Sequence, residues 1–198
     1  MIQDELVGVI LGAGESSRFG TAKQLLPFGD TTLLGYVVRN VNRSRLDRVV
    51  VVLGREAPSV RNSFDPGPAI VVDNLAYGKG CASSLLAGLD EAGDCAGLVL
   101  ILGDQPGVET TYIDTAIAEW RDARPWASVM EYRGRLGHPL IFSRDCLDDL
   151  RELHGDKAVW KLIEGYPERV LRVDIDSELP PDIDTPEDYQ AEMERYLS

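Results

Sequence analysis

Residues 6–23 read LVGVILGAGESSRFGTAK. The run 6–11 is almost wholly apolar and has the length of a buried strand. Three glycines and two serines follow it, together with Arg18 and Lys23. Glycines let backbone N–H groups approach an anion, and the two cations neutralise its charge. The stretch therefore predicts a strand that leads into a phosphate-binding loop.

The spacing within this loop excludes two common phosphate-binding motifs. A dinucleotide-binding GxGxxG would need glycine where Ser17 stands, and a P-loop would need a lysine directly after a glycine, followed by a hydroxyl residue. On the residues alone, an ordinary glycine turn between a strand and a helix remains the alternative.

The rest of the chain alternates apolar runs of strand length with segments of helical period. This pattern predicts an α/β fold with a largely parallel sheet, in one domain spanning 1–198. Strands are expected at 6–11, 49–53, 70–72, 98–102 and 169–175, and helices at 32–45, 83–91, 110–124, 145–153, 157–164 and 186–197. Two extended pieces, 127–132 and 139–142, flank the turn RGRLG and predict an inserted β-hairpin.

The composition and charge of the chain exclude some classes of binding partner. The chain has 198 residues and a formal net charge of −13, which argues against binding to nucleic acids or anionic membranes. No apolar run approaches the roughly 20 residues of a membrane span. The N-terminus lacks the basic flank of a signal peptide, and the three cysteines form no CxxC pair. We expect a soluble cytoplasmic protein.

Acidic residues follow one predicted strand and precede the last predicted helix. Asp104 follows the apolar run 98–102 after a single glycine, at the strand end where open α/β sheets bind ligands. A carboxylate beside a phosphate cradle would repel the anion without a cation between them, which suggests Mg²⁺. The alternative is that Asp104 caps the turn before Pro106. In the segment DIDTPED (182–188), Thr185 suits a helix N-cap, but this explains neither Asp182 nor Asp184.

Several motifs together resemble a known family. LGAGESSRFGTAKQLLPFGDTTLL (11–34) resembles the opening LAAGxSxRMGxxKxLLPxxGxxLL of the nucleotidyltransferases typified by molybdenum-cofactor cytidylyl- and guanylyltransferases. GDQP (103–106), GKGCASSLLAGL (78–89), RGRLGHP (133–139) and DIDTPEDY (182–189) resemble further segments of that family. The resemblance implies a three-layer α/β/α fold with a mostly parallel, Rossmann-like sheet of the nucleotide-diphospho-sugar transferase type.

The resemblance also implies roles for individual residues. Lys23, Arg18 and Asp104 would be catalytic, Asp104 and Asp184 would bind Mg²⁺, and Asp182 is a further candidate ligand. Arg133, Arg135 and His138 would lie on the acceptor side, although a histidine before proline is also a common turn residue. The nucleotide-binding residues implied are Leu11, Gly12, Ala13, Gly14, Arg18, Lys23, Asn74, Gly80, Ser83, Ser84 and Asp104. Ser83 and Ser84 could instead cap the amides of the following helix.

Two positions bear on the choice of substrates. The position of Ala13 is alanine in the cytidylyltransferase branch and glycine in the guanylyltransferase branch, so the resemblance favours CTP. Residues 158–160, Ala-Val-Trp, replace the Gly-Ala-Arg common in cytidylyltransferases, and Gly12 replaces the family's usual alanine. The activity implied is transfer of CMP from CTP to the terminal phosphate of molybdopterin, for a recipient molybdoenzyme.

Two other functions stay open at this point. One is a guanylyltransferase, or another NTP-dependent nucleotidyltransferase, that acts on a different small phosphorylated acceptor. The other is a non-catalytic carrier that binds a nucleotide or the cofactor for a molybdoenzyme.

Overall fold

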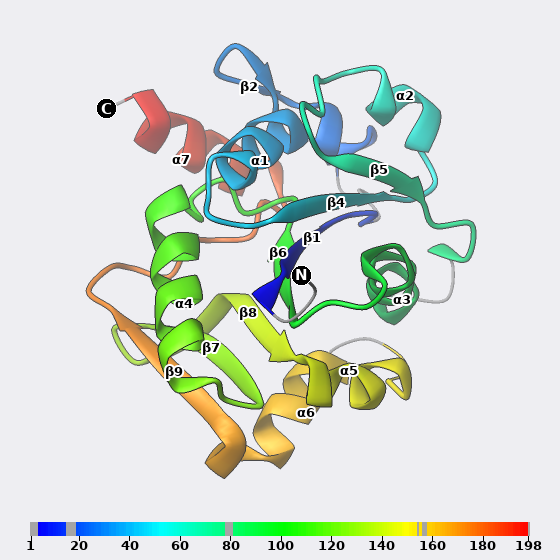
Figure 1. Cartoon of the computed structure of the whole chain (residues 1–198). Helices are drawn as coiled ribbons and strands as arrows, with labels where there is room; N and C mark the ends of the chain where they lie inside the picture. The colour runs from blue at the N-terminus through cyan, green and yellow to red at the C-terminus, as the bar shows by residue number, and fades with distance from the viewer. Residues whose placement is uncertain (1–3, 15–18, 78–80, 154, 156–157, 198) are drawn as a thin grey trace.

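A mixed β-sheet organises the described part of the chain, which comprises residues 4–14, 19–77, 81–153, 155 and 158–197 of the computed structural model (Figure 1). Its strand order is β5-β4-β1-β6-β8-β7-β9, and β8 alone among these strands runs antiparallel to the rest. The strands are β1 (Leu6–Gly12), β4 (Arg48–Leu53), β5 (Ile70–Asp73), β6 (Gly97–Leu102), β7 (Ala127–Tyr132), β8 (Arg135–Ser143) and β9 (Val170–Ile175).

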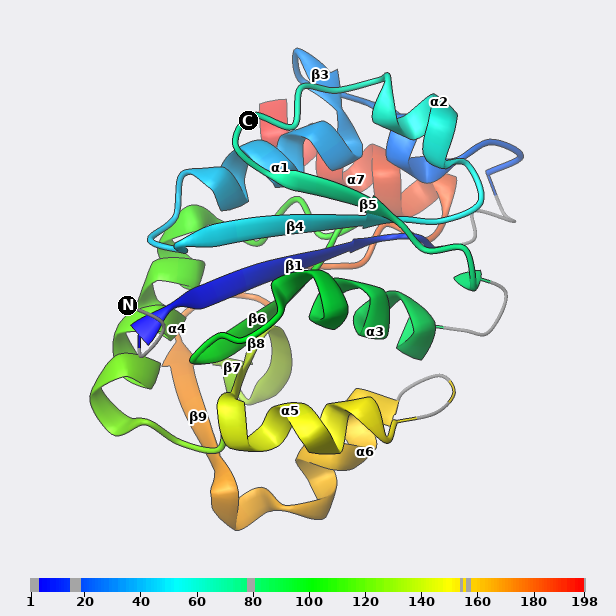
Figure 2. The same cartoon turned by 45° about the vertical axis from the view of Figure 1, so that its right-hand side comes forward.

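Both faces of the sheet are covered, as the nearly continuous apolar strands predict. Along β1, Leu6 and Ile10 belong to one core cluster, and Val7 and Val9 belong to the other. The first cluster packs under α1 (Leu33–Asn42), α2 (Ala57–Arg61) and α4 (Thr110–Ala123). The second packs under α3 (Cys81–Ala92), α5 (Arg144–Arg151) and α6 (Ala158–Gly165) (Figure 2). The predicted three-layer α/β/α fold is confirmed.

A third, smaller cluster joins the last helix to residues that lie shortly after β1 in the chain. Phe28 and Leu33 pack with Ile183, and Tyr189 and Met193 of α7 (Pro186–Leu197) lie against them. This packing places α7 beside the segment that follows β1. The last helix is therefore held near the loop on which the sequence analysis centres.

The β7–β8 hairpin is tighter than its sequence suggested. Its turn consists of Arg133 and Gly134, whose φ angles of 44° and 83° are both positive, as a two-residue hairpin turn requires. Strand β8 therefore begins at Arg135 rather than at Pro139, and it pairs with β6 as well as with β7. The inserted hairpin is an integral part of the main sheet.

The helix expected at 32–45 ends earlier, since α1 is Leu33–Asn42, and several short elements were not expected. The sequence pattern did not indicate α2, the 3₁₀ helices η2 (Lys23–Leu25) and η4 (Pro167–Arg169), or the small ribbon of β2 (Pro27–Phe28) and β3 (Thr31–Thr32). Each is too short to show a hydrophobic period. None of the helices in the described residues combines the length and the apolar character of a membrane span.

Candidate active site

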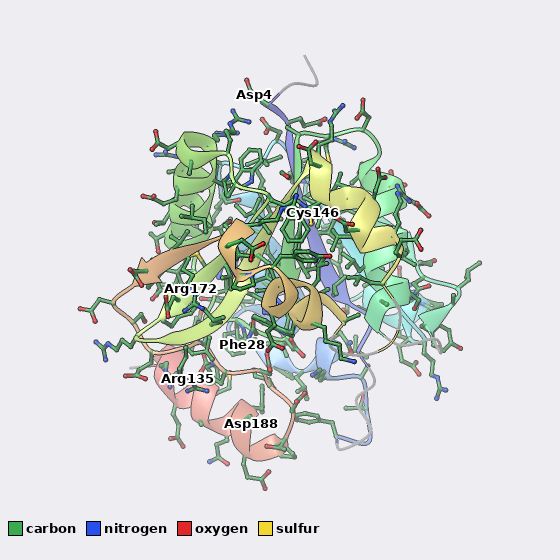
Figure 3. All side chains as sticks on the ribbon, turned by 90° about the horizontal axis from the view of Figure 1, so that it is seen from below. Asp4, Phe28, Arg135, Cys146, Arg172 and Asp188 are labelled. Atoms are coloured by element: carbon green, nitrogen blue, oxygen red, sulfur yellow. The ribbon has the colours of Figure 1, made fainter. Side chains whose placement is uncertain are left out.

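The carboxyl ends of β1 and β6 meet at one edge of the sheet. The Gly103 N–H donates to the carbonyl of Leu11 (3.0 Å). A Cβ on Gly103 would lie 2.9 Å from Leu34 Cδ1 and 3.0 Å from the Leu11 carbonyl oxygen, so this close approach requires glycine. The contact sets Asp104 next to the glycine-rich loop. Figure 3 shows Asp188, in α7 (Pro186–Leu197), at the opposite end of the view from Asp4, which lies just before β1.

Lys23 connects the charged groups at this edge of the sheet. Its side chain is only 6% exposed, and Nζ donates to Asp104 Oδ2 (2.6 Å) and Asp184 Oδ1 (2.8 Å). Nζ also donates to the carbonyl of Ile183 (3.0 Å). One ammonium group thus joins segments that lie 81 and 161 residues away along the chain.

The electrostatics of this cluster keep Lys23 charged. Burial by itself lowers the pKa of the Lys23 ammonium group. The charges and hydrogen bonds of Asp104 and Asp184 outweigh that effect, so the pKa is raised above its ordinary value. At neutral pH the site therefore holds an ammonium ion between two carboxylates.

The donor set suits a divalent cation that also binds a phosphate ligand. Asp104 Oδ1 is buried and has no hydrogen-bond partner among the described residues, so it keeps a lone pair for a cation. Within the same residues, no group of three or more His, Cys, Asp and Glu side chains could hold a metal ion by itself. Mg²⁺ commonly binds one or two carboxylates and completes its shell with phosphates and water. Asp104 and Asp184 fit that pattern.

The start of α7 determines where Asp184 lies. Asp188 Oδ2 accepts from the N–H groups of Thr185 (2.8 Å) and Asp184 (3.2 Å), and the Asp188 N–H donates to Thr185 Oγ1 (3.2 Å). This reciprocal arrangement is a capping box with Thr185 as the N-cap, as the sequence indicated. It fixes the backbone directly after Asp184.

Asp182 lies at the same edge, two residues before Asp184. Desolvation by its surroundings, together with the negative charges of Asp104 and Asp184, raises its pKa to about 6, although Lys23 and a hydrogen bond from Gln105 act in the opposite direction. Asp182 therefore lies close enough to Asp104 and Asp184, the two proposed metal ligands, for their negative charges to raise its pKa.

The glycine-rich loop lies over a second buried polar residue. Gln24 is 6% exposed, and its Nε2 donates to the carbonyls of Gly12 (2.9 Å) and Gly14 (3.1 Å). Sequence reasoning missed Gln24. Its neighbours Lys23 and Leu25 gave no indication that an amide between them would be buried.

A cavity of about 470 Å³ opens on the loop. That volume falls within the range of small-molecule sites. Gly12, Ala13, Gly14 and Gln24 line it, and a Cβ on Gly14 would lie 3.7 Å from Lys23 Cε, so the lysine side chain passes close to this wall. Among the other lining residues are polar side chains that sequence reasoning did not single out: Arg55, Glu56 and Tyr77.

Asn74 is buried at the end of β5 and faces the start of α3. Its Nδ2 donates to the hydroxyls of Ser83 (2.9 Å) and Ser84 (3.0 Å), and its Oδ1 accepts from the N–H of Ala76 (2.8 Å). The structure thus brings the three predicted residues together and gives each a structural hydrogen bond.

The predicted acceptor residues lie on the β7–β8 hairpin, whose turn shares the carboxyl edge with Asp104. Arg133 is exposed and forms ion pairs with Asp176 and Glu178 (2.8 Å each). Arg135 is exposed at the start of β8. His138 is 6% exposed and packs edge-to-face against Trp160, and burial lowers its pKa to about 4. The imidazole is therefore neutral at pH 7.

Two of the predicted residues, Arg18 and Gly80, lie outside the described residues. Leu11 lies in β1, where its carbonyl accepts the hydrogen bond from Gly103. The described site is thus assembled from the ends of β1, β5 and β6, from η2, and from the segment before α7.

Comparison with known proteins identifies the family. The model of the "MobA-like NTP transferase domain" matches residues 8–170, and the chain belongs to this family of nucleotidyltransferases. The family resemblance that the sequence motifs indicate is thereby confirmed.

Individual relatives cover nearly the whole chain. It is 29% identical over 197 residues to the purine catabolism protein PucB of Bacillus subtilis, covering 93% of this chain and 94% of that one. It is 27% identical over 191 residues to the molybdenum cofactor cytidylyltransferase of Escherichia coli, covering 95% of each chain.

Solved structures of mycobacterial proteins are similar in sequence and in fold. The Rv0371c homologue from Mycobacterium sp. strain JC1 is 40% identical, with a TM-score of 0.88 over 97% of this chain and 96% of that chain. Rv0371c of Mycobacterium tuberculosis H37Rv in complex with manganese is 35% identical, with a TM-score of 0.83 over 96% of this chain and 98% of that chain.

Proposed function

We propose that the protein, as one nucleotidyltransferase domain over residues 1–198, transfers CMP from CTP to the terminal phosphate of molybdopterin and releases pyrophosphate. The observation that carries this proposal is the convergence of Lys23, Asp104 and Asp184 beside the glycine-lined cavity. The name of the Escherichia coli relative supports the choice of reaction.

The reaction needs no covalent nucleophile from the protein. An oxygen of the acceptor phosphate forms a bond to the α-phosphorus of CTP, and the bond from that phosphorus to the bridging oxygen of the β-phosphate breaks. The acceptor phosphate is already ionised near neutral pH, so catalysis consists of alignment and charge neutralisation. Lys23 and Arg18 would hold the triphosphate, and the cavity would hold the rest of the nucleotide.

Asp104 and Asp184 would hold Mg²⁺. When bound, the metal ion would neutralise charge on the transferred phosphoryl group and on the leaving pyrophosphate. Asp104 Oδ1, which has no hydrogen-bond partner among the described residues, supports a divalent cation at this edge. The structure of the 35% identical Rv0371c in complex with manganese supports the use of a divalent cation.

The acceptor side is proposed from the position of the hairpin. Arg135 is exposed at the edge that carries Asp104, whereas Arg133 would have to exchange its ion pairs with Asp176 and Glu178 for a phosphate. His138 is neutral and buried, so in this proposal it shapes the acceptor side through its packing on Trp160.

Ala13 supports CTP over GTP in this proposal. It lines the cavity, and a Cβ on Gly54 would lie 3.0 Å from Ala13 Cβ, so the methyl group occupies a closely packed wall. A glycine there, as in the guanylyltransferase branch, would leave that space open.

The experiment measures pyrophosphate release with each of CTP, GTP, UTP and ATP, with and without Mg²⁺ and molybdopterin. Release that needs CTP, Mg²⁺ and molybdopterin together is the expected result. Release with GTP in place of CTP would move the protein to the guanylyltransferase branch. Stabilisation by a nucleotide in a thermal shift assay, without release of pyrophosphate, would favour the non-catalytic carrier.

A further inference from the structure

Two consecutive buried polar residues attach η2 to opposite halves of the site. Lys23 reaches the acidic segments, and Gln24 reaches the glycine-rich loop. Nε2 of Gln24 carries two hydrogens and donates to two carbonyls, those of Gly12 and Gly14. The amide group therefore links two points of the loop that are separated by a single residue.

This contact answers a physical problem of glycine-rich anion sites. Gly12 and Gly14 have no side chain to restrict their backbone angles, so their peptide groups could rotate. A carbonyl that turned toward a polyphosphate would present its negative end to a negative ligand. A carbonyl that accepts a hydrogen bond from a buried amide is fixed in orientation, and one of its lone pairs is engaged. The backbone N–H groups are then left to serve the anion.

The surroundings of the loop support a fixed conformation. A Cβ on Gly12 would lie 3.1 Å from Leu34 Cδ2 and 3.2 Å from the Val52 carbonyl oxygen, so Gly12 is closely packed. Gln24 itself lines the cavity together with Gly12 and Gly14. The loop is thus packed on one side and held by Gln24 at the cavity wall.

We infer that Gln24 is a positioning residue. It holds the Gly12–Gly14 backbone in the conformation that binds the β- and γ-phosphates of a nucleoside triphosphate. The inference rests on the proposed function, since it assumes that this cavity binds a nucleotide. Gln24 acts through the loop and needs no contact with the reacting atoms.

The test compares Gln24→Met, which keeps the length of the side chain but lacks the donor, with the wild type. Binding of CTP and of CMP is measured by calorimetry in the presence of Mg²⁺. Losing two hydrogen bonds that order the loop is expected to weaken CTP binding about tenfold or more and CMP binding less than about threefold. Gln190→Met, on the exposed surface of α7, is the matched control and should leave both affinities unchanged.

Gln24→Asn provides a second variant in case Gln24→Met does not fold. It keeps an amide but is shorter by one methylene, so it cannot span both carbonyls, and the same selective loss of CTP binding is expected. An equal change in CTP and CMP affinity, or none, in a folded variant would overturn the inference and leave the proposed function standing. A wild-type protein that binds no nucleoside triphosphate would overturn both.

Discussion

Lys23 carries much of the chemistry of the site at the scale of single residues. Its ammonium group lies between two carboxylates. The Lys23 side chain is 6% exposed, whereas the Asp184 side chain is 53% exposed. Taking one partner out of a buried ion pair leaves an uncompensated charge, which costs more than the pair itself contributes. The stability of the cluster therefore depends on each of its members. Asp104 is the member that pairs with Lys23 and would also bind the metal ion.

Asp104→Asn tests that dependence. Asparagine keeps the shape of the side chain and an oxygen for Lys23, but it lacks the negative charge that a metal ion needs. We expect pyrophosphate release to fall by about 100-fold or more, in line with the loss of one group that stabilises transition-state charge. Asp148→Asn, at an exposed position of α5, is the control. Unchanged turnover in a folded Asp104→Asn variant would remove Asp104 from the mechanism.

His138 makes stability depend on pH. Its pKa is about 4 in the folded protein and about 6.5 in an unfolded chain. Between these values the unfolded state binds the proton and the folded state does not, so the free energy of unfolding falls as the pH falls from about 6.5 towards about 4. Between pH 7 and pH 5 the contribution is about 2 kcal/mol.

Urea unfolding of the wild type and of His138→Gln at pH 7 and pH 5 checks this value. The variant should lose less stability between the two pH values than the wild type does, by about that amount. An equal loss in both proteins would show that the buried imidazole is not the source.

Helix α7 shows how an element, rather than a residue, sets the geometry of the site. Asp184 lies directly before the capping box of Thr185 and Asp188, and Ile183 packs with Phe28 and Leu33. The Ile183 N–H also donates to the Asp104 carbonyl (3.0 Å). The start of the helix is therefore tied to the strand end that carries the other carboxylate.

Thr185→Ala removes the N-cap and should lower the free energy of unfolding by about 1 kcal/mol, the usual cost of a lost threonine cap. Thr185→Ser keeps the hydroxyl and should stay close to the wild type. Urea unfolding monitored by circular dichroism gives both values. If alanine and serine proved equally stable, Thr185 Oγ1 would have no capping role.

The elements differ in how far their sequences predict them. β1 and α4 have long apolar patterns, and their observed bounds lie within a residue or so of the expected ones. The segment KQL of η2 shows no period, and its polar residues face the protein interior because partners from elsewhere in the chain satisfy them. The β7–β8 turn is shorter than the sequence predicted, because Arg133 adopts a positive φ angle that its residue type does not indicate.

At the scale of the whole molecule, the site exists because strands distant in sequence end at one edge. Gly103, just after β6, packs directly against the backbone of Leu11 and Gly12 at the end of β1. Any side chain there would push apart the two segments that carry Asp104 and the glycine-rich loop.

Gly103→Ala should therefore destabilise the protein by about 1–3 kcal/mol, the usual cost of an overpacked core, and should lower nucleotide affinity as Asp104 moves. Gly165→Ala is the matched control, because a Cβ on Gly165 meets no atom within 4 Å. The control should stay within about 0.5 kcal/mol of the wild type. Chemical denaturation and CTP titration of both variants measure the two effects, and similar values for the two would contradict this role of Gly103.

The local sequence by itself determined the fold class, the longer strands and helices, and the residue types of the site, because apolar periodicity, glycine content and capping residues act over a few neighbouring positions. The strand end indicated Asp104 as a candidate, and the resemblance of DIDTPEDY to the family's segment implied Asp184. Only the tertiary structure decided that Lys23 lies between them and that Gln24 holds the loop. Those contacts join residues that packing of the sheet and of α7 brings together, and no local pattern records which distant partner a buried polar group will meet.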